Sequence, residues 1–393
     1  MKGPLSSLKV LDFSTLLPGP FASLLLADMG AEVLRIESPA RVDLVRMLPP
    51  HVEGVSTSHA YLNRNKRCLA LDLKQPEALH VVHRLVAEYD IVLEQFRPGV
   101  MDKLGLGYEA LKAINPRLIY VSITGYGQTG PYRERAGHDI NYLALSGLAS
   151  YTGRRDSGPL PLGMQVADIA GGSLHGVIGL LAAVIQRQQT GLGQQVDISM
   201  TDCAFSLHAM AGAGYLGAGV EPDMENQVLN GGSFYDYYRT RDGRWLSVGS
   251  LEPQFMQQFC AALGRPDLAV LGLSAKDQQQ LKRDITIEVE KRDLAEWRQR
   301  FAGVDACVEP VLKLSEAVEH PQLKARGVVT EVPGTSGTAQ RQIACPIRFS
   351  EALPAPRHIG AAVGAHNDEV LRELGYDDDA IDALRKSGAL GRT

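Results

Sequence analysis

A histidine and two acidic residues occur in settings from which their side chains could exchange protons with a substrate. His138 lies in the polar cluster GHDINY, immediately before the apolar run LALSGLA. Asp168 stands at the start of a long apolar segment, and Glu252 lies in the short segment LEPQF. Histidine and carboxyl side chains are common general acids and bases in enzymes.

Each of these residues also has a purely structural interpretation. Asp168 would cap the backbone N–H groups of the helix that it begins, although a helix N-terminus also stabilises a carboxylate or an oxyanion. Glu252 would be an ordinary acidic residue in the first turn of a helix. His138 lies in a connection between elements, where catalytic residues are common, but its position alone leaves both interpretations open.

Other motifs that carry chemistry in proteins are interpreted here as structural. Residues 125–130 match GxGxxG after a strand, but no apolar helical pattern follows them, as a dinucleotide-binding motif requires. His80 and His83 have helical spacing, yet no nearby carboxylate or cysteine completes a set of metal ligands. His175 lies in an apolar helix and is predicted to be a core residue. We expect no metal site and no nicotinamide.

The composition excludes several classes of protein. The 393 residues are 45% hydrophobic and 22% charged, which is enough for two or three domain-sized units. A net charge of −5 argues against a nucleic-acid or anionic-membrane partner, although a local basic patch suffices for one anionic ligand. The five cysteines are widely spaced and include no CxxC, so we expect reduced thiols.

The chain is expected to be soluble and cytoplasmic. Its N-terminal segment meets Asp12 early and has no uninterrupted apolar stretch of the kind found in signal peptides. The longest apolar stretch, residues 176–185, is too short to span a bilayer.

The elements that must position the polar residues alternate between strands and helices. Short apolar runs predict strands at residues 8–14, 31–37, 91–96, 117–124 and 194–200. Helical spacing with typical start and stop residues predicts helices at residues 21–30, 76–88 and 168–190. This alternation indicates an α/β protein with a largely parallel sheet covered by helices.

A second region begins where the composition changes, at residues 218–233. After it, Asp242-Gly243 marks the turn of a predicted hairpin, and charged helical segments continue to about residue 305. Residues 332–338 are predicted to form a loop, and an amphipathic helical tail ends the chain. We predict a large domain at residues 1–215, completed by 320–393, and a small α+β domain at 225–310, with linkers at 216–224 and 311–319.

Motifs along nearly the whole chain resemble those of the family III CoA-transferases and their relatives, the 2-methylacyl-CoA racemases. This resemblance implies a Rossmann-like large domain that binds CoA, a smaller α+β domain, and an interlocked homodimer whose subunits thread through each other. The active site then lies between the two domains. The motifs are LLPGPFASLLLADMGAEVLRIE, NRNKRCLALDLK, RPGVMDKLGLGYE, GYGQTGP, GHDINYLALSG and GAHNDEVL.

Two branches of this family differ at the residues that carry chemistry. Transferases use an aspartate that matches Asp168 as a nucleophile, through an acyl anhydride. Racemases keep this aspartate and add a histidine that matches His138 and a glutamate that matches Glu252. Many transferases have an aromatic residue at the histidine position and a longer glycine-rich loop, where this chain has only Asn230-Gly231-Gly232. The resemblance favours a racemase, with a transferase as the alternative.

By this resemblance, the reaction inverts carbon 2 of a 2-methylacyl-CoA through an enolate. His138 and Asp168 would be the acid–base pair, and Asp139 and Glu252 would orient and polarise them. The N–H groups at the start of the Asp168 helix would stabilise the enolate oxygen. No cofactor is implied beyond the coenzyme A of the substrate.

The resemblance also implies residues that bind the substrate. Leu71, Asp72, Leu73 and Lys74 would contact the adenosine of CoA, and Arg97 its phosphates. Racemases have an arginine near the position of Ser38, so the contact to the 3'-phosphate falls to Arg35, Arg41 or Arg46. The remaining substrate-binding residues implied by the GHDINY motif are Gly137, Ile140, Asn141 and Tyr142. The acyl chain is left open, as is a third hypothesis, a CoA-binding scaffold without catalysis.

Overall fold

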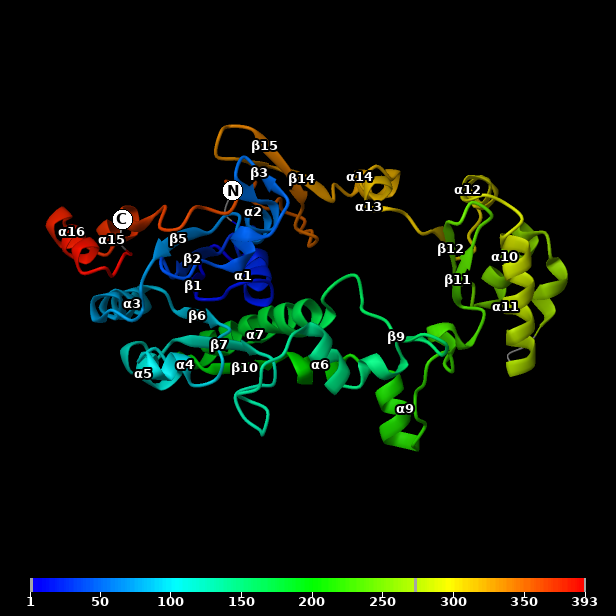
Figure 1. Ribbon diagram of the computed structural model, residues 1–393, viewed down its shortest axis with the longest axis horizontal. Helices are drawn as coiled ribbons and strands as arrows, with labels where there is room; N and C mark the ends of the chain where they lie inside the picture. Colours follow the sequence, from blue (N-terminus) through cyan, green and yellow to red (C-terminus); the bar gives the residue numbers. More distant parts are fainter. Residues whose placement is uncertain (1–2, 272–273, 392–393) are drawn as a thin grey trace. The chain divides into compact units, whose positions relative to one another are not determined.

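A parallel sheet organises the larger part of the chain in this computed structural model, which describes residues 3–271 and 274–391 (Figure 1). Five of its six strands were predicted from short apolar runs, which are typical of strands buried on both faces. The remaining strand, β5, lies in the charged segment NRNKRCLALDLK and was not predicted. The strands are β1 (Lys9–Asp12), β2 (Glu32–Glu37), β5 (Arg67–Ala70), β6 (Ile91–Glu94), β7 (Ile119–Thr124) and β10 (Gln195–Ser199).

The order of these strands reverses in the middle of the sheet. The sheet runs β10-β7-β6-β1-β2-β5, and every neighbouring pair is parallel. The chain therefore builds outward from β1 to β5 and then returns to the other side of β1 with β6. This is the 3-2-1-4-5-6 order of doubly wound folds, in which ligands bind at the carboxyl ends of the strands beside the reversal. The α/β prediction is confirmed.

Helices cover both faces of the sheet (Figure 1). On one face, α1 (Pro18–Asp28) and α7 (His175–Thr190) contact each other and the strands. The other face packs on α3 (Pro76–Glu88), α5 (Tyr108–Ile114), α15 (Asn367–Glu373) and α16 (Asp378–Lys386), which share one hydrophobic core. The predicted amphipathic tail is thus two helices, which are separated by Gly375. The helices α15 and α16 near the end of the chain therefore complete the hydrophobic core formed by the N-terminal strands.

The helix predicted to begin at Asp168 begins earlier and has an unusual first part. Residues Ala167–Leu174 form wide π-helical turns, η3, that continue into α7, and Val166 precedes them as the cap residue. The interpretation of Asp168 as the N-cap is therefore wrong. Single π-helical segments inside α-helices are often found at functional sites.

The length of this helix also corrects the estimate made from its apolar stretch. Residues Ala167–Thr190 form 24 helical residues, long and apolar enough to cross a membrane by length and composition alone. In the structure 44% of the most apolar 18-residue stretch of this helix is buried, and the helix packs on β7, β10 and α1. It serves as a layer of the α/β unit.

The first unit comprises Met1–Ser146, Gly163–Leu207 and Lys324–Thr393. It differs from the predicted large domain, residues 1–215 and 320–393, because Gly147–Leu162 belong to the other unit. Its middle segment also ends at Leu207 instead of residue 215, and its last segment begins at Lys324 instead of residue 320. Two hairpin strands, β14 (Val329–Pro333) and β15 (Ala339–Ile343), enclose most of the predicted loop at residues 332–338. Its other short elements are η1 (Leu44–Met47), β3 (His51–Val52), β4 (Val55–Ser56), α2 (Thr57–Leu62), α4 (Val100–Lys103), α6 (Asp139–Leu145) and α8 (Met200–Ser206).

The second unit comprises Gly147–Leu162 and His208–Leu323. The predicted hairpin is confirmed as β11 (Asp236–Arg239) and β12 (Trp245–Val248), and β13 (Val308–Pro310) joins it as a third antiparallel strand. Around the fully buried Trp297, apolar residues of α10 (Pro253–Leu263), α11 (Ala275–Val289) and α12 (Leu294–Phe301) form a separate core. Shorter elements are η2 (Leu148–Tyr151), β8 (Gly153–Arg154), β9 (Gly158–Pro159), α9 (Ala211–Ala218), η4 (Val228–Gly232), η5 (Pro266–Val270), α13 (Leu314–Ala317) and α14 (Pro321–Ala325).

Candidate active site

A cavity of about 440 Å³ lies in the first unit, at the carboxyl ends of β1, β6 and β7. It therefore occupies the place that the reversal of strand order predicts for a ligand. Its walls mix apolar side chains with several arginines. They are formed by Leu16–Pro18, Gln95–Pro98, Ile123–Tyr126, Arg133, Arg135–His138, Asn141, Tyr142, Asp168 and Met200.

His138 reaches this cavity from the residue that precedes α6. Its extended backbone (φ −130°) caps the helix, and its N–H donates a hydrogen bond to Asn141 Oδ1 at 3.0 Å. The Asn141 side chain thus fixes the backbone from which the imidazole projects. The His138 ring is exposed to solvent and lines the cavity.

Asp168 reaches the same cavity from η3. Its carboxyl group is partly buried, and burial, reinforced by the nearby charge of Asp139, raises its pKa to about 6. His138 acts in the opposite direction, as a neighbouring cation would. A carboxyl group with this pKa takes up a proton far more readily near neutral pH than an ordinary aspartate does.

Asp139 lies between these two residues without lining the cavity. Its Oδ1 accepts a hydrogen bond from the Asp168 backbone N–H at 3.0 Å, and the N–H of Ile169 is bonded to the Gln165 carbonyl. These two N–H groups at the start of the helix are therefore already engaged. The expectation that such groups would bind an enolate oxygen is wrong for Asp168 and Ile169.

Tyr142 supports the wall that carries His138. Its hydroxyl donates to the Gly137 carbonyl at 2.6 Å, and its ring packs edge-on against Tyr126. A Cβ at Gly125 or Gly137 would lie 2.6 Å from this ring, so only glycine fits there. The first glycine of the GxGxxG match therefore makes room for an aromatic side chain, and no helix follows Gly130 directly.

A second cavity, of about 560 Å³, adjoins the first at Leu16 and Phe96, which line both. Residues 71–74, predicted to contact adenosine, line it directly after β5, together with the segment 36–44. Leu71 is fully buried, whereas Lys74 is exposed. Arg97 lines the first cavity. The structure thus places the predicted nucleotide residues next to the predicted acid–base pair.

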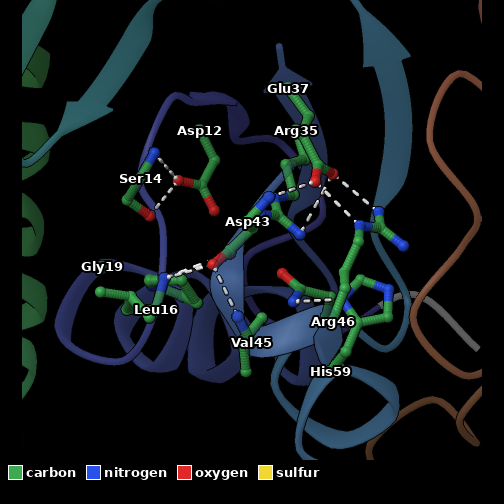
Figure 2. Close-up of polar contacts among 12 residues, drawn as sticks. Asp12, Ser14, Leu16, Gly19, Arg35, Glu37, Asp43, Val45, Arg46 and His59 are labelled. Carbon is green, nitrogen blue, oxygen red and sulfur yellow. Dashed lines mark hydrogen bonds and ion pairs between the residues drawn. The ribbon is translucent and has the colours of Figure 1, made fainter. Parts of the chain in front are cut away.

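The three arginines expected near the 3'-phosphate differ in their availability, and Figure 2 shows the contacts of two of them, Arg35 and Arg46. Arg35 is buried, with Nη2 at 2.5 Å from Asp43 Oδ2 and Nη1 at 3.5 Å from Glu37 Oε2. Arg46 binds Glu37 with two hydrogen bonds of 2.7 and 2.8 Å. Arg41 is exposed, lines the second cavity, and makes no ion pair with any residue that the structure describes.

Two of the predicted residues lie elsewhere. Glu252 belongs to the second unit, where it is exposed and its carbonyl accepts from the Met256 N–H of α10. Its part in the chemistry stays a prediction. Ile140 is 56% exposed and does not line the first cavity.

Several residues that line the cavity belong to no motif from which the sequence could have predicted them. Leu16–Pro18 follow β1, and their place beside the reversal of strand order was the available signal. Arg133 and Arg135 also line the cavity, but charged residues in a loop normally indicate a solvated surface. Among residues 3–271 and 274–391, no group of three or more His, Cys, Asp or Glu could hold a metal ion.

Known proteins resemble this chain along nearly its whole length. The alpha-methylacyl-CoA racemase of Homo sapiens is 38% identical over 386 residues, covering 96% of this chain and 95% of that protein. The succinate–glutarate CoA-transferase of Agrobacterium fabrum is 34% identical over 393 residues, covering 95% and 96%. A solved CAIB/BAIF family protein from Brucella suis is 32% identical, with a TM-score of 0.83, and covers 95% of this chain and 100% of its own.

The match to a family model spans residues 5–367 and confirms the resemblance predicted from the motifs. Since both this model and relatives above 30% identity cover nearly the whole chain, the protein belongs to CoA-transferase family III.

Proposed function

We propose that this protein is a racemase that inverts carbon 2 of 2-methylacyl-CoA thioesters. The observation that carries the proposal is that His138 and Asp168 line one cavity, where burial raises the pKa of Asp168 to about 6. A carboxyl group near this value can both give and take a proton at neutral pH, which inversion requires in its two directions.

The reaction needs one proton shared between two groups. With His138 neutral and Asp168 protonated, the imidazole removes the proton from carbon 2 and an enolate forms. Asp168 then gives its proton to the opposite face, which leaves an imidazolium and a carboxylate. The opposite enantiomer reacts from that state in reverse. For repeated inversion of one enantiomer, both groups exchange protons with solvent and so return to their starting protonation states. The chemistry requires no cofactor other than the CoA of the substrate.

Asp139 has two effects on this pair. Its carboxylate accepts the Asp168 N–H at 3.0 Å and so holds the start of η3 against α6. Its charge also helps burial to keep the pKa of Asp168 raised. We propose that Asp139 supports the acid form of Asp168. The orienting role of Glu252 that the family resemblance implies is kept as a proposal.

For the nucleotide we propose the second cavity, with Arg41 at the 3'-phosphate. Arg35 and Arg46 are engaged by Glu37 and Asp43, whereas Arg41 is exposed, lines this cavity and makes no ion pair within residues 3–271 and 274–391. A guanidinium suits the geometry of a phosphate.

A CoA-transferase is the second candidate, because the transferase of Agrobacterium fabrum is nearly as similar as the human racemase. In that reaction the Asp168 carboxylate attacks the thioester carbonyl, forms an acyl anhydride and releases CoA. The same aspartate serves both reactions, so His138 is the residue that distinguishes them.

We also propose that the protein is a homodimer with interlocked subunits. The face of the η3–α7 helix turned away from the sheet carries Leu174, Ile178 and Ile185, which are 41%, 63% and 58% exposed. These residues recur at helical spacing, as in a face that another protein surface covers.

In heavy water, the wild-type protein is expected to place deuterium at carbon 2 of a 2-methylacyl-CoA without a free acid acceptor. His138→Ala should lower net inversion about 10²–10⁴-fold but leave exchange for one enantiomer, the one whose proton faces Asp168. His80→Ala, in the exposed part of α3, is the control and should behave as wild type.

Transfer of CoA to a carboxylic acid, without exchange at carbon 2, would contradict the racemase and favour the transferase. Asp168→Ala should then abolish turnover, and His138→Ala should leave it largely intact. If His138→Ala inverts both enantiomers at the wild-type rate, its assigned role is wrong.

Asp139→Asn keeps an oxygen that can accept the Asp168 N–H but removes the charge. The pKa of Asp168 should therefore fall from about 6 toward the ordinary 3.8, and the pH–rate profile for exchange should move to lower pH on the limb that reports Asp168. Asp139→Ala, which also removes the hydrogen bond, should in addition lower kcat. A profile that Asp139→Asn leaves in place would contradict the electrostatic role.

Arg41→Gln should raise the inhibition constant of free CoA about tenfold, since one hydrogen-bonded charge pair contributes roughly 1.5–3 kcal/mol to binding. The inhibition constant of 3'-dephospho-CoA should not change, because that compound lacks the phosphate concerned. Arg372→Gln, in the exposed part of α15, is the matched control. If Arg41→Gln weakens the binding of CoA and of 3'-dephospho-CoA equally, Arg41 contacts a part of the ligand other than the 3'-phosphate.

In sedimentation velocity the protein is expected to remain a dimer at all accessible dilutions, because threaded subunits separate only by unfolding. Ile178→Asp should lower the yield of folded dimer, since it buries a charge in the proposed interface. Val270→Asp, at a position 84% exposed in η5, should be tolerated. A monomer that appears on dilution would contradict the interlocked assembly.

A further inference from the structure

One buried carboxylate holds together the two loops that meet between the cavities (Figure 2). Both oxygens of Asp43 accept the Leu16 N–H at 3.1 Å, and Oδ1 also accepts the Val45 N–H at 3.0 Å. The Asp43 side chain is 0% exposed. It therefore ties the loop that follows β1 to the segment that follows β2.

Leu16 is held in a conformation that leucine rarely adopts. Its φ is +60°, in the left-handed region, where the side chain of a residue other than glycine crowds its own backbone. Such backbone persists only where the surroundings over-determine it, and it is concentrated at functional sites. The two hydrogen bonds from its N–H to Asp43 are the visible restraint.

The orientation of Asp43 is itself determined by buried charges. Arg35 Nη2 lies 2.5 Å from its Oδ2, and its own N–H donates to Glu37 Oε1 at 3.1 Å. Glu37 is bound in turn by Arg46, whose Nη2 donates to the Ala361 carbonyl at 3.0 Å. These contacts leave the carboxylate no alternative position in the packed interior.

The restraint extends from one cavity to the other. Asp43 and Leu44 line the nucleotide cavity, and Leu16 lines both cavities. Two residues on, the Pro18 carbonyl accepts a hydrogen bond from Ser173 Oγ at 2.6 Å. Ser173 belongs to η3, the helical segment that carries Asp168.

We propose that Asp43 is a positioning residue that makes the binding of the CoA nucleotide contribute to catalysis at the acyl carbon. When the nucleotide cavity is filled, Asp43 holds the wall formed by Leu16–Pro18 in position. Through this wall it holds η3 where the Asp168 carboxyl group can react with the substrate. The proposal rests on the proposed acyl-CoA chemistry, whether racemisation or transfer.

Binding energy from a remote part of a substrate can raise kcat only through a structure that connects it to the reacting centre. A substrate without the nucleotide should then react with a lower kcat, and loss of the connection should affect only the complete substrate. A residue that merely stabilises the fold would lower the rates of both substrates by the same factor. The comparison of the two substrates therefore separates positioning from stability.

The experiment measures kcat for wild type and Asp43→Asn with a 2-methylacyl-CoA and with the same acyl group on pantetheine. Exchange at carbon 2 and transfer to a free acid are both recorded. Asp43→Asn should lower kcat for the acyl-CoA about 10²-fold, as small misplacements of a catalytic group do. It should change kcat for the acyl-pantetheine by less than about twofold, within the error of independent effects.

Asp43→Glu serves if the neutral variant does not fold, because it keeps a charge for Arg35 but displaces the acceptor of the Leu16 N–H by one methylene. The same selective loss is expected. Asp378→Asn, which removes a carboxylate paired with Arg372 on the exposed surface, is the matched control and should lower neither rate.

Equal loss for both substrates, or no loss, would overturn the positioning role while leaving the proposed function intact. If the wild type neither exchanges nor transfers with either substrate, the proposed function fails first and this inference fails with it.

Discussion

The reversal of strand order between β1 and β6 is the constraint on which the rest of the structure depends. β1 and β6 are neighbouring parallel strands, but the chain leaves their carboxyl ends toward opposite sides of the sheet. The two connections therefore leave a crevice between them at this end of the sheet. The loops after β1 and β6 therefore diverge, and the two cavities lie at this edge, with Leu16 and Phe96 between them. The side chains proposed for catalysis reach this crevice from η3 and from the connection before α6.

Charged groups are buried around this crevice at considerable expense in desolvation. Arg35, Glu37 and Asp43 have almost no exposed surface, yet each is paired and hydrogen-bonded. Ion pairs in such places often contribute little to stability compared with apolar residues of similar size. Their effect here is geometric, since they hold Leu16 in the left-handed region and the 38–47 segment beside the second cavity. They also engage Arg35 and Arg46, so that Arg41 is the arginine of this segment that we propose for a phosphate.

The two residues proposed as the acid–base pair lie in different environments. His138 lies on an exposed helix cap, whereas Asp168 is partly buried in π-helical turns beside Asp139. Burial and the neighbouring carboxylate favour the protonated form of Asp168. The same aspartate, if ionised, would be the nucleophile of a transferase. The two proposed reactions therefore share Asp168 and differ in the use that each makes of His138.

The sequence by itself determined the α/β class and five of the six strands of the main sheet, because apolar periodicity is a property of neighbouring residues. It also singled out His138 and Asp168 as candidates, through local motifs and the family resemblance. It did not reveal β5, whose charged residue Arg67 is paired with a carboxylate far along the chain, Glu369 of α15. Nor did it show that Asp139 occupies the helix N–H of Asp168, or that Arg35 and Arg46 are engaged. Those facts were decided by the tertiary structure alone, because a hydrogen bond or ion pair depends on which distant side chains the folded sheet brings within reach.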